Sequence, residues 1–481
     1  MAEELGITVK KDEDFSEWYL EVVRKGEFVD QRTPLKGFDV LRPWGYRCWE
    51  LLQQRIDELF KENGVENTYF PMLIPVSFFE KEAEHFEGFN PELVKVTKAG
   101  DKELEEELAI RTTSETIIYH MFSKWIRSYR DLPMKVNQWV NIVRWETKMT
   151  KPLVRPREFL WQEGHTAHAT KEDALKQVEK IKEIYRKIHE EFLGLPVMIL
   201  KRTDLDKFAG AEMSLAFDMV MPDGKIVQGA TDHLLNQMFP KAFGVQFEDK
   251  DGKKKYVWTT SWGLSEREVG CVIMMHGDDE GAVLPPLIAP YQVVIIPIVF
   301  ENEKEKVLKE ARKLEKDIKR LGIRVHLDDR DEYTPGFKFN EWELKGVPLR
   351  VEIGPKDIEK NQIVAVKRND GKKFGIKRNE LKELVSILNS IQKELFEAAK
   401  KHLKGRINDA KTLEEASKLL KEKGGFVRVN WCGSQKCEEK INEELTAEVR
   451  GTLYGKQEKI FGPCIYCGKN AKEVAYVAKA Y

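Results

Sequence analysis

Apolar residues recur every three or four positions over several long stretches of the chain, which is the spacing of one face of an α-helix. These stretches predict helices over residues 15–24, 44–62, 114–129, 171–192, 303–321 and 384–403. Shorter apolar or alternating runs predict strands over residues 65–71, 293–299, 323–327, 349–353 and 362–368. The helix over 44–62 is followed by Asn63-Gly64, a pair that commonly stops a helix.

The pattern changes near residue 290. Before it, strands and helices are mixed. After it, the continuous apolar run that begins at Val293 suits a buried parallel strand, and the helix and strand that follow complete the start of a βαβ unit. A chain of 481 residues is too long for one core. We therefore predict three domains, over residues 1–286, 287–400 and 401–481.

The segment over residues 143–165 has the most unusual pattern of polar and apolar positions. If its two halves are strands joined by a loop, alternation places Phe159, Trp161, Glu163 and His165 on one face. An unpaired buried polar group costs about 1–3 kcal/mol, so Glu163 and His165 do not suit a purely hydrophobic core. A nucleotide beside a small cationic ligand would use all four side chains. The alternative, a surface hairpin with a solvated face, leaves both aromatic residues without a role.

Charge and composition limit the partners of the chain. Lys and Arg number 80 and Asp and Glu 81, a net charge of −1, so any contact with RNA must be local. No run of ~18 apolar residues occurs, and the N-terminus lacks the apolar core of a signal peptide. We expect a cytoplasmic protein that does not enter a membrane.

Four of the six cysteines are grouped near the C-terminus. They form a C-x4-C pair and, 26 residues later, a C-x2-C pair, which in a cytosolic chain favours a tetrahedral zinc site over disulfides or free thiols. Cys48 and Cys271 stand alone in apolar surroundings and are expected to be small buried residues. The ligands of the zinc site are Cys432, Cys437, Cys464 and Cys467.

The segment over residues 143–165 resembles motif 2 of class II aminoacyl-tRNA synthetases, and its REFLWQEGH wording resembles the prolyl-tRNA synthetases of subclass IIa. Other pieces of the same resemblance are TSE at Thr113, FAGAE at Phe208, QGATDH at Gln228, SWGLSER at Ser261 and WELKGVPLRVEIGPKD at Trp342. Thr112 stands where the family usually has proline. The resemblance implies an α+β catalytic domain with an antiparallel sheet, an α/β anticodon-binding domain and a small α/β zinc-binding C-terminal domain.

The implied activity is ATP-dependent attachment of L-proline to its tRNA, first as prolyl-adenylate and then by transfer to the 3′-terminal adenosine. This chemistry needs no general base, because the attacking carboxylate is already ionised; it needs arginines whose forks match phosphate oxygens. Residues 162–229 leave no room for an extra domain of ~150 residues. The chain therefore resembles the archaeal/eukaryotic-like type. The family implies a homodimer, whose interface would include the helix and strand over residues 44–71.

The resemblance also assigns residues to roles, with Arg144 and Arg267 as the catalytic pair. The proline site would comprise Phe89, Thr113, Glu115, Arg144, Trp161, Glu163, His165, Phe208, His233, Ser261 and Gly263. The ATP site would comprise Arg144, Glu146, Arg155, Pro156, Arg157, Phe159, Gln228, Thr231, Ser265 and Arg267. The anticodon of proline tRNA would meet Phe339, Glu343, Arg350, Lys356 and Asp357. The implied cofactors are ATP, Mg²⁺ and a structural Zn²⁺.

Two other functions compete with this interpretation. A related subclass IIa synthetase is one; the threonyl enzymes bind their substrate through zinc, whereas only Cys48 and Cys271 lie in the catalytic region here. A catalytically silent tRNA-binding paralogue is the other, and Arg144, Glu146 and Arg267 argue against it. Cysteine, which is close to proline in size, stays open as a second activated amino acid.

Overall fold

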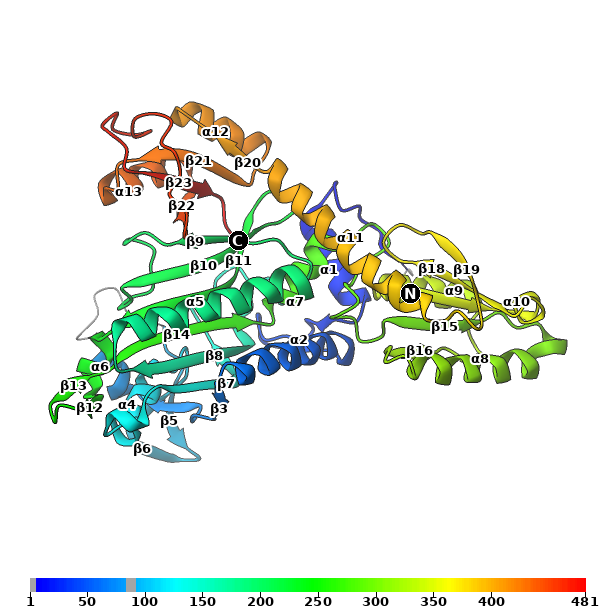
Figure 1. Cartoon of the computed structure of the whole chain (residues 1–481), viewed down its shortest axis with the longest axis horizontal. Coiled ribbons are helices and arrows are strands. Elements are labelled where there is room, and N and C mark those ends of the chain that lie inside the picture. The colour runs from blue at the N-terminus through cyan, green and yellow to red at the C-terminus, as the bar shows by residue number, and fades with distance from the viewer. Residues whose placement is uncertain (1–5, 84–91) are drawn as a thin grey trace.

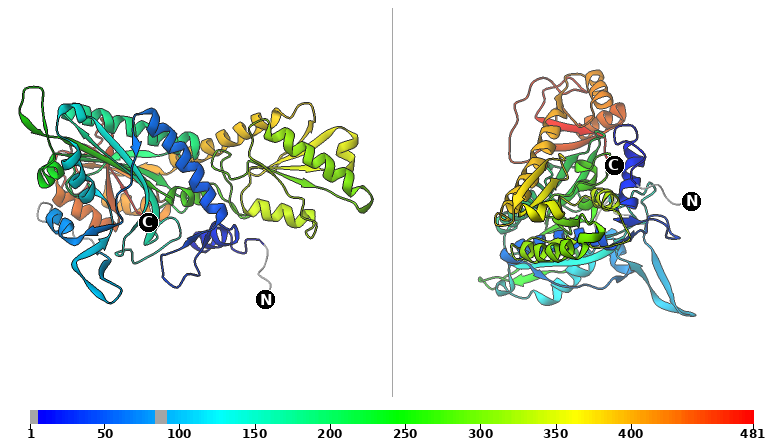
Figure 2. Two further views of the ribbon diagram at one scale, coloured as in Figure 1. Left: turned by 90° about the horizontal axis from the view of Figure 1, so that it is seen from below. Right: turned by 90° about the vertical axis from the view of Figure 1, so that its right-hand side faces the viewer.

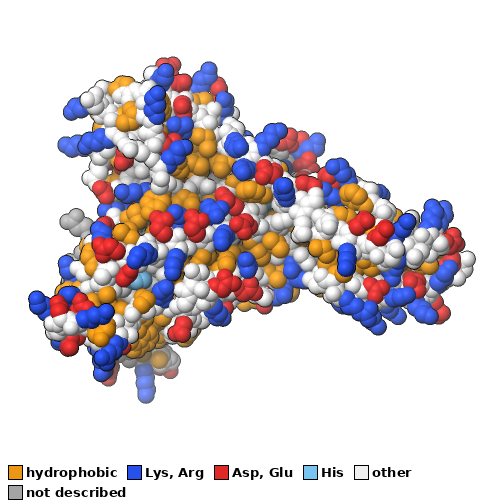
Figure 3. Space-filling view, viewed as in Figure 1, with side chains coloured by type: hydrophobic (Ala, Val, Ile, Leu, Met, Phe, Trp, Pro, Cys, Tyr) orange, Lys and Arg blue, Asp and Glu red, His pale blue; other side chains and the backbone are white. Residues whose placement is uncertain are grey.

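The computed structural model describes residues 6–83 and 92–481, which form three regions around one large sheet (Figure 1). The central region contains most of that sheet. In this view the α/β module lies at the right and the C-terminal region lies at the top. Figure 2 shows the α/β module extending away from the central region, with the long helix α11 (Glu383–Gly405) running between that module and the C-terminal region. Charged side chains of both signs are interspersed over the face shown in Figure 3.

The two N-terminal helices match the sequence prediction, whereas the strands of this part of the chain do not. Helix α1 (Phe15–Lys25) starts where the Asp14 carboxylate accepts hydrogen bonds from two backbone amides, and α2 (Pro43–Glu62) starts with Pro43 and ends at Asn63. A short hairpin, β1 (Val29–Asp30) and β2 (Val40–Leu41), joins them. The strand predicted over residues 65–71 is wrong in length, because only β3 (Glu66–Asn67) pairs, in parallel with β7.

The central sheet has the order β20-β21-β23-β22-β9-β10-β11-β14-β8-β7-β3. Its middle strands are β7 (Met134–Val143), β8 (Glu158–His168), β9 (Met198–Lys201), β10 (Met213–Val220), β11 (Ile226–Asn236) and β14 (Trp258–Ser265). From β7 to β9 every pairing is antiparallel, so the expected antiparallel sheet is confirmed. One face is covered by α5 (Lys171–Lys187), its π-helical extension η2 (Ile188–Phe192) and α7 (Arg267–His276).

Smaller elements border the open face of this sheet. A three-stranded sheet contains β4 (Leu73–Pro75), β6 (Lys102–Ile110) and β5 (Lys95–Ala99). Near it lie α3 (Val76–Ala83), α4 (Glu115–Trp125), η1 (Tyr129–Asp131), α6 (Met238–Phe243), β12 (Gln246–Glu248) and β13 (Lys254–Tyr256). The helix predicted over 114–129 ends earlier than expected, at Trp125, because the chain becomes extended at Ile126, and a separate 3-10 turn starts at Tyr129.

The α/β module has a five-stranded sheet in the order β16-β15-β17-β18-β19. Its elements are β15 (Val293–Pro297), η3 (Glu301–Glu303), α8 (Lys304–Lys319), β16 (Val325–Leu327), α9 (Pro335–Leu344), β17 (Leu349–Ile353), α10 (Pro355–Glu359), β18 (Gln362–Lys367) and β19 (Lys373–Lys377). The predicted βαβ start is confirmed, since β15 pairs in parallel with both β16 and β17. Helices α8 and α11 pack on one face of the sheet and α9 packs on the other.

The C-terminal region continues the central sheet. Its elements are β20 (Ile407–Asp409), α12 (Leu413–Glu422), β21 (Phe426–Trp431), α13 (Gln435–Leu445), β22 (Glu448–Leu453) and β23 (Glu473–Ala478). Strand β22 pairs with β9, so two regions far apart in sequence share one hydrogen-bonded sheet. Helix α11 runs through residues 400 and 401, and the predicted domain boundaries stay predictions. Among the described residues no helix is long and apolar enough to span a membrane.

Candidate active site

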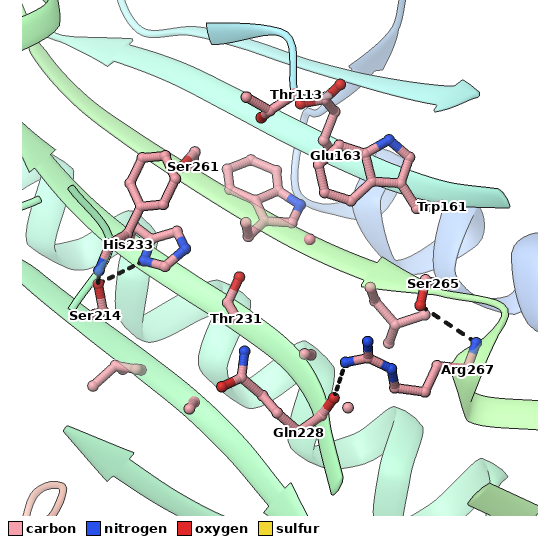
Figure 4. A pocket seen from close by; sticks show the side chains of 18 of the residues that line it. Thr113, Trp161, Glu163, Ser214, Gln228, Thr231, His233, Ser261, Ser265 and Arg267 are labelled. Atoms are coloured by element: carbon pink, nitrogen blue, oxygen red, sulfur yellow. Dashed lines mark hydrogen bonds between the residues drawn. The ribbon is translucent and has the colours of Figure 1, made fainter. Parts of the chain in front are cut away.

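A cavity of about 350 Å³ opens on the uncovered face of the central sheet. It is lined by strands β8, β10, β11 and β14, with contributions from the segment before α4 and the start of α7 (Figure 4). The residues predicted from the sequence that line it are Thr113, Glu115, Arg144, Phe159, Trp161, Glu163, His165, Phe208, Gln228, Thr231, His233, Ser261, Gly263, Ser265 and Arg267. Most of the predicted site is thus brought together in one place.

Strand alternation and register explain why these residues meet. Trp161, Glu163 and His165 lie two apart on β8, so they point to the same face. Their partners on β14 are Ser265, Gly263 and Ser261, and Gly263 and Ser261 in turn pair with Thr231 and His233 on β11. Rows of residues in register across three strands therefore form the floor of the cavity. The sequence prediction that Phe159, Trp161, Glu163 and His165 share one face of a strand is confirmed.

One end of the cavity holds two buried carboxyl groups beside an imidazole. Ligand atoms of Glu115, Glu163 and His165 all lie within 4.8 Å of one another. The Glu163 carboxylate accepts hydrogen bonds from Gln138 Nε2 at 2.7 Å and from the Ser114 amide at 3.3 Å. The His165 Nε2 atom lies 3.2 Å from Glu163 Oε2. The hydroxyl of Thr113 donates to Glu115.

The surroundings separate the two carboxyl groups in acidity. Burial raises the pKa of Glu115. Burial alone would also raise the pKa of Glu163, but hydrogen bonds from His165, Ser114 and Gln138 outweigh it, and the pKa is lowered. The charged form is therefore favoured at Glu163, whose side chain is only 2% exposed. A ligand with N–H donors and a positive charge fits this end.

The opposite end holds the partly buried Arg267 guanidinium, and the partly buried Arg144 guanidinium lies between the two ends. Arg267 Nε donates to the Val154 carbonyl at 2.7 Å, and Arg267 Nη1 donates to the Gln228 carbonyl at 2.7 Å. The Arg144 guanidinium lies 5.5 Å from the ring centres of Phe159 and Trp161. Burial lowers the pKa of both arginines, yet arginine stays protonated in proteins. Two cations that are held by carbonyls and ring faces favour an anionic ligand.

Neutral groups line the wall between these ends. Burial lowers the pKa of His233 to about 3, so its imidazole is uncharged, and its Nδ1 atom lies 2.8 Å from Ser214 Oγ. Phe208 stacks obliquely on the same imidazole, with 5.0 Å between ring centres. The Ser261 hydroxyl is buried and has no hydrogen-bond partner within the described part of the chain. It is therefore available to a ligand.

Four predicted ATP-site residues in the loop between β7 and β8 do not line the cavity, although Arg144, at the start of the same loop, does. Glu146 and Arg155 are exposed, and Pro156 is buried. Arg157 donates to the Thr147 carbonyl at 3.0 Å, with its guanidinium 4.5 Å from the ring centre of Trp145. Strand periodicity does not set side-chain directions in a loop, so the sequence could not place these four. Phe89, predicted for the proline site, lies outside the described residues.

The C-terminal tyrosine contacts the same loop. The Lys151 ammonium lies 4.8 Å from the ring centre of Tyr481 and 5.0 Å from that of Tyr19. The Tyr481 hydroxyl donates to Asp223 at 2.6 Å. The end of the chain thus packs beside the loop between β7 and β8.

The sequence prediction missed several lining residues. They are Arg202, Asp206, Ser214, Leu215, Ala216, Gly229, Ala230, Trp262 and Leu264. Arg202 follows β9 outside any motif, and its guanidinium donates to Gln228 Oε1. One available signal was Asp218, a carboxylate within the otherwise apolar run of β10, since a buried charge requires a charged partner.

The predicted anticodon residues are only partly brought together. Arg350 Nη1 donates to Glu343 at 2.5 Å, and the guanidinium lies 4.0 Å from the ring centre of Phe339. Lys356 and Asp357 instead lie on α10, beyond the other end of β17, where Asp357 accepts a hydrogen bond from the Gly354 amide. The structure therefore brings Phe339, Glu343 and Arg350 together and leaves Lys356 and Asp357 apart from them, at the start of α10.

The cysteine predictions agree with the structure. The sulfur atoms of Cys432, Cys437, Cys464 and Cys467 lie within 4.8 Å of one another, so the predicted clustering is confirmed. This spacing and a set of four thiols suit one tetrahedral zinc ion. Cys48 and Cys271 are fully buried, as expected of small core residues.

Models of known protein families match three parts of the chain. The class II core domain of the tRNA synthetases for G, H, P, S and T matches residues 94–276. An anticodon-binding domain matches residues 292–388, and the C-terminal domain of prolyl-tRNA synthetases matches residues 413–481. The three matches follow one another in the same order as the three regions of the structure.

Whole proteins are similar over nearly the full length. The proline–tRNA ligase of Natranaerobius thermophilus is 46% identical over 475 residues, which cover 98% of this chain and 97% of that protein. That of Cenarchaeum symbiosum is 46% identical over 479 residues, or 99% of this chain and 100% of that protein. The crystal structure of prolyl-tRNA synthetase from Cryptosporidium parvum, complexed with halofuginone and AMPPNP, has a TM-score of 0.92, 42% identity and 99% coverage of both chains.

Proposed function

This chain belongs to the prolyl-tRNA synthetases, and on that premise we propose that its cavity binds proline at the Glu163 end and ATP at the Arg267 end. The chain attaches proline to its tRNA in two steps: ATP is consumed in forming prolyl-adenylate, and the prolyl group is then transferred to the tRNA with release of AMP. The observation that carries the assignment of sites is the opposite charge of the two ends. The positively charged ammonium of proline suits the carboxylates at one end, and the negatively charged phosphates of ATP suit the guanidinium group at the other.

The proline end is proposed from the chemistry of a secondary ammonium. Proline offers two N–H donors and one positive charge, which the Glu163 carboxylate and the Thr113–Glu115 pair can accept. Trp161 and Phe208 offer apolar faces for the ring, and the free Ser261 hydroxyl lies on the same strand as Gly263. The further members proposed for this site are His165, His233 and, outside the described residues, Phe89.

The ATP end is proposed from the arginines. Arg144 would meet both the proline carboxylate and the α-phosphate, because it lies between the aromatic wall and the cavity, and Arg267 would meet the outer phosphates. Phe159 would stack on adenine, with Gln228, Thr231 and Ser265 on the ribose and phosphates. Mg²⁺, which accompanies ATP in this class, would neutralise phosphate charge. The similar structure with bound AMPPNP, an ATP analogue, supports a nucleotide site.

The loop residues require a change of position in this proposal. Glu146, Arg155, Pro156 and Arg157 would reach the nucleotide only if the loop between β7 and β8 closed over it. Loops that order on ligand binding are a common way to complete an active site. Arg157 would then exchange the Thr147 carbonyl for phosphate oxygens.

We also propose residues that contact the tRNA, a zinc ion and a second subunit. The chain binds tRNA, and we assign base reading to Phe339, Glu343 and Arg350, with Lys356 and Asp357 as outlying contacts. We assign a structural Zn²⁺ to the four clustered cysteines. Exposed apolar side chains at Tyr69, Met72 and Leu73 support a homodimer interface beside α2. Because tRNA charging serves the ribosome, we assign the protein to the cytoplasm.

Pyrophosphate exchange into ATP, measured with each of the twenty amino acids, tests the proposed substrate. We expect exchange with proline, and none with tetrahydrofuran-2-carboxylate, which keeps the ring and carboxylate but replaces the N–H donors by an ether oxygen. Preference for another amino acid would overturn the proline assignment. Absence of exchange with every amino acid would favour a silent tRNA-binding protein. Exchange with cysteine beside proline would show that the cavity selects by size rather than by ring shape.

A further inference from the structure

A buried cluster of three charged side chains joins the C-terminal region to the wall of the active site. Asp218 on β10 is fully buried, and Arg202 and Arg450 are each 6% exposed. Asp218 Oδ1 accepts from Arg202 Nη2 at 3.0 Å and from Arg450 Nη2 at 3.2 Å, and Oδ2 accepts from Arg450 Nε at 3.0 Å. Arg202 Nη1 also donates to the Arg450 carbonyl at 2.5 Å. One carboxylate is thus shared by two arginines from different regions.

The cluster reaches the cavity through a glutamine. Arg202 lines the cavity, and its Nη2 atom donates to Gln228 Oε1 as well as to Asp218. Because a guanidinium can only donate hydrogen bonds, this contact fixes which end of the Gln228 amide faces Arg202. The amide nitrogen is left toward the cavity, on the side of Thr231, where Figure 4 shows it. Two N–H donors are therefore presented to a ligand with oxygen acceptors.

The C-terminal region docks closely enough to bury Arg450 at this place. Strand β22 pairs with β9 at Thr452 and Lys201. Gly451 has a φ of +117°, and a Cβ at this position would lie 2.1 Å from the Lys201 carbonyl oxygen. A second tie lies beside it, since the Thr203 hydroxyl donates at 2.5 Å to Glu438 on α13. Glycine at position 451 therefore permits the approach that brings the preceding residue, Arg450, to Asp218.

We propose that Arg450 is a positioning residue for the nucleotide, which acts through Asp218 and Arg202 to orient the amide of Gln228. The proposal rests on the assignment of Gln228 to the ATP site made above. Arg450 donates to both oxygens of Asp218, so Arg202 shares only Oδ1. The Nη2 atom of Arg202 directs one hydrogen to that oxygen and its other hydrogen to Gln228. Without Arg450, Asp218 would draw Arg202 into a two-pronged pair, because a buried carboxylate requires its hydrogen bonds. Gln228 would then lose its fixed orientation.

A purely structural role for the cluster makes a different prediction. If it only fastens two regions together, loss of Arg450 should affect both substrates alike, and loss of any other docking contact should have the same effect. Tyr454 provides the matched control, since its hydroxyl donates at 2.6 Å from the C-terminal region to Glu179 on α5, away from the cluster. Tyr454→Phe removes one docking hydrogen bond and leaves the cluster intact.

The experiment is pyrophosphate exchange by the full chain, with the KM for ATP and the KM for proline measured separately. We expect Arg450→Met to raise the KM for ATP about tenfold and to change the KM for proline less than about twofold. Arg450→Lys keeps the charge with a single donor group and should give an intermediate effect. Tyr454→Phe should match the wild type. Combining Arg450→Met with Gln228→Ala should add little to Gln228→Ala alone, because both changes act through the oriented amide of Gln228.

Several results would overturn the proposal. These are equal rises in both KM values, an effect of Tyr454→Phe as large as that of Arg450→Met, or full additivity with Gln228→Ala. Should Arg450→Met fail to fold, Arg450→Lys carries the test, and an unchanged KM for ATP in that folded variant counts against us. Exchange by the wild type distinguishes a failure of the proposed function from a failure of the role proposed for Arg450. No proline-dependent exchange by the wild type refutes the proposed function, whereas normal exchange with an unaffected KM for ATP refutes only the role of Arg450.

Discussion

Arg144 lies where the two halves of the active site meet. Its guanidinium is near the rings of Phe159 and Trp161 and close enough to Glu163 and Glu115 for their charges to affect its pKa. No side-chain carboxylate among the described residues forms a salt bridge with it, and its hydrogen bond is to the Thr112 carbonyl at 3.4 Å. A long, weak contact of this kind is easily exchanged for a ligand's oxygen. Arg144 is therefore suited to charge that develops during adenylate formation.

We predict that Arg144→Ala abolishes most proline-dependent exchange while leaving the fold intact. Loss of one such donor to a transition state typically costs about 2.7–4 kcal/mol, or a factor of about 10²–10³ in kcat. Arg130→Ala, which removes an exposed arginine outside the cavity, is the control and should retain wild-type exchange. A loss of less than about tenfold in a folded Arg144→Ala protein would show that the phosphate is held elsewhere.

Glu266 makes the stability of the catalytic region depend on pH. Its carboxyl group is 2% exposed and accepts a hydrogen bond at 3.0 Å from the Leu160 amide at the start of β8. Burial raises its pKa from 4.5 to about 8. The folded protein therefore binds this proton more tightly than the unfolded chain does. The stabilisation is fully present below pH 4.5 and is lost as the pH rises to about 8.

We predict that Glu266→Gln flattens this dependence. The amide keeps an acceptor for Leu160 and carries no ionisable proton, so between pH 5 and 8 the variant should lose up to about 1.4 kcal/mol less stability per pH unit than the wild type. Denaturant unfolding at matched pH values measures the difference. Parallel slopes for the two proteins would mean that Glu266 is already ionised in the folded state.

At the scale of elements, the α/β module has two faces with different chemistry. Helix α8 covers one face with apolar residues four or three apart, at Val307, Ala311, Leu314 and Ile318. Helix α9 and strand β17 meet on the other face, where Arg350 lies against Phe339 and Glu343. An aromatic ring, a guanidinium and a carboxylate within reach of one another can stack on and hydrogen-bond to unpaired bases. We therefore propose the α9 face as the one that reads bases.

We predict that Arg350→Ala impairs aminoacylation of proline tRNA and spares exchange of pyrophosphate, because Arg350 lies in a module separate from the cavity. A base-reading arginine contributes about 1–3 kcal/mol of discrimination. A tRNA with either anticodon guanine replaced should therefore lose its disadvantage against the variant. Lys309→Ala, on the α8 face, is the matched control and should still discriminate. Undiminished discrimination by Arg350→Ala would assign base reading to other residues.

At the scale of the whole molecule, one sheet runs from the catalytic region into the C-terminal region. The pairing of β22 with β9 and the sharing of Asp218 connect the cysteine cluster to the active-site wall. Cys437 and Glu438 are neighbours on α13, and Glu438 accepts the hydrogen bond of Thr203. A zinc ion at the four thiols would therefore stabilise the docking of this region as well as its own fold.

We predict one zinc per chain, removed by replacing both Cys432 and Cys467 with serine. Because metal binding at such sites is coupled to folding, the C-terminal region should exchange its amide hydrogens sooner than the catalytic region does. The KM for ATP should rise in the same variant, since Arg450 would no longer be held at Asp218. Cys48→Ser, at a cysteine buried in the core, should retain the metal. Metal analysis without zinc, together with unchanged stability, would contradict this prediction.

Elements with a strong local signal could be predicted from the sequence. Helix α2 and strand β17 were predicted within a residue of their observed ends, because apolar periodicity and stop signals act over short distances. The predicted strand over residues 65–71 failed, because only two of its residues find a neighbouring strand. Strand pairing depends on tertiary contacts, which a local pattern of residues does not predict.

Alternation along the chain is enough to predict which side chains share the floor of the site. Trp161, Glu163 and His165 alternate on one strand, and a period of two residues places them on one face in any sheet. The neighbours of Gln228, in contrast, follow from how distant strands pair. Arg202 and Arg450 meet at Asp218 across 248 residues of chain, because β22 pairs with β9, and no local pattern encodes that pairing. A buried carboxylate needs partners of opposite charge, and the fold alone determines where in the chain those partners come from.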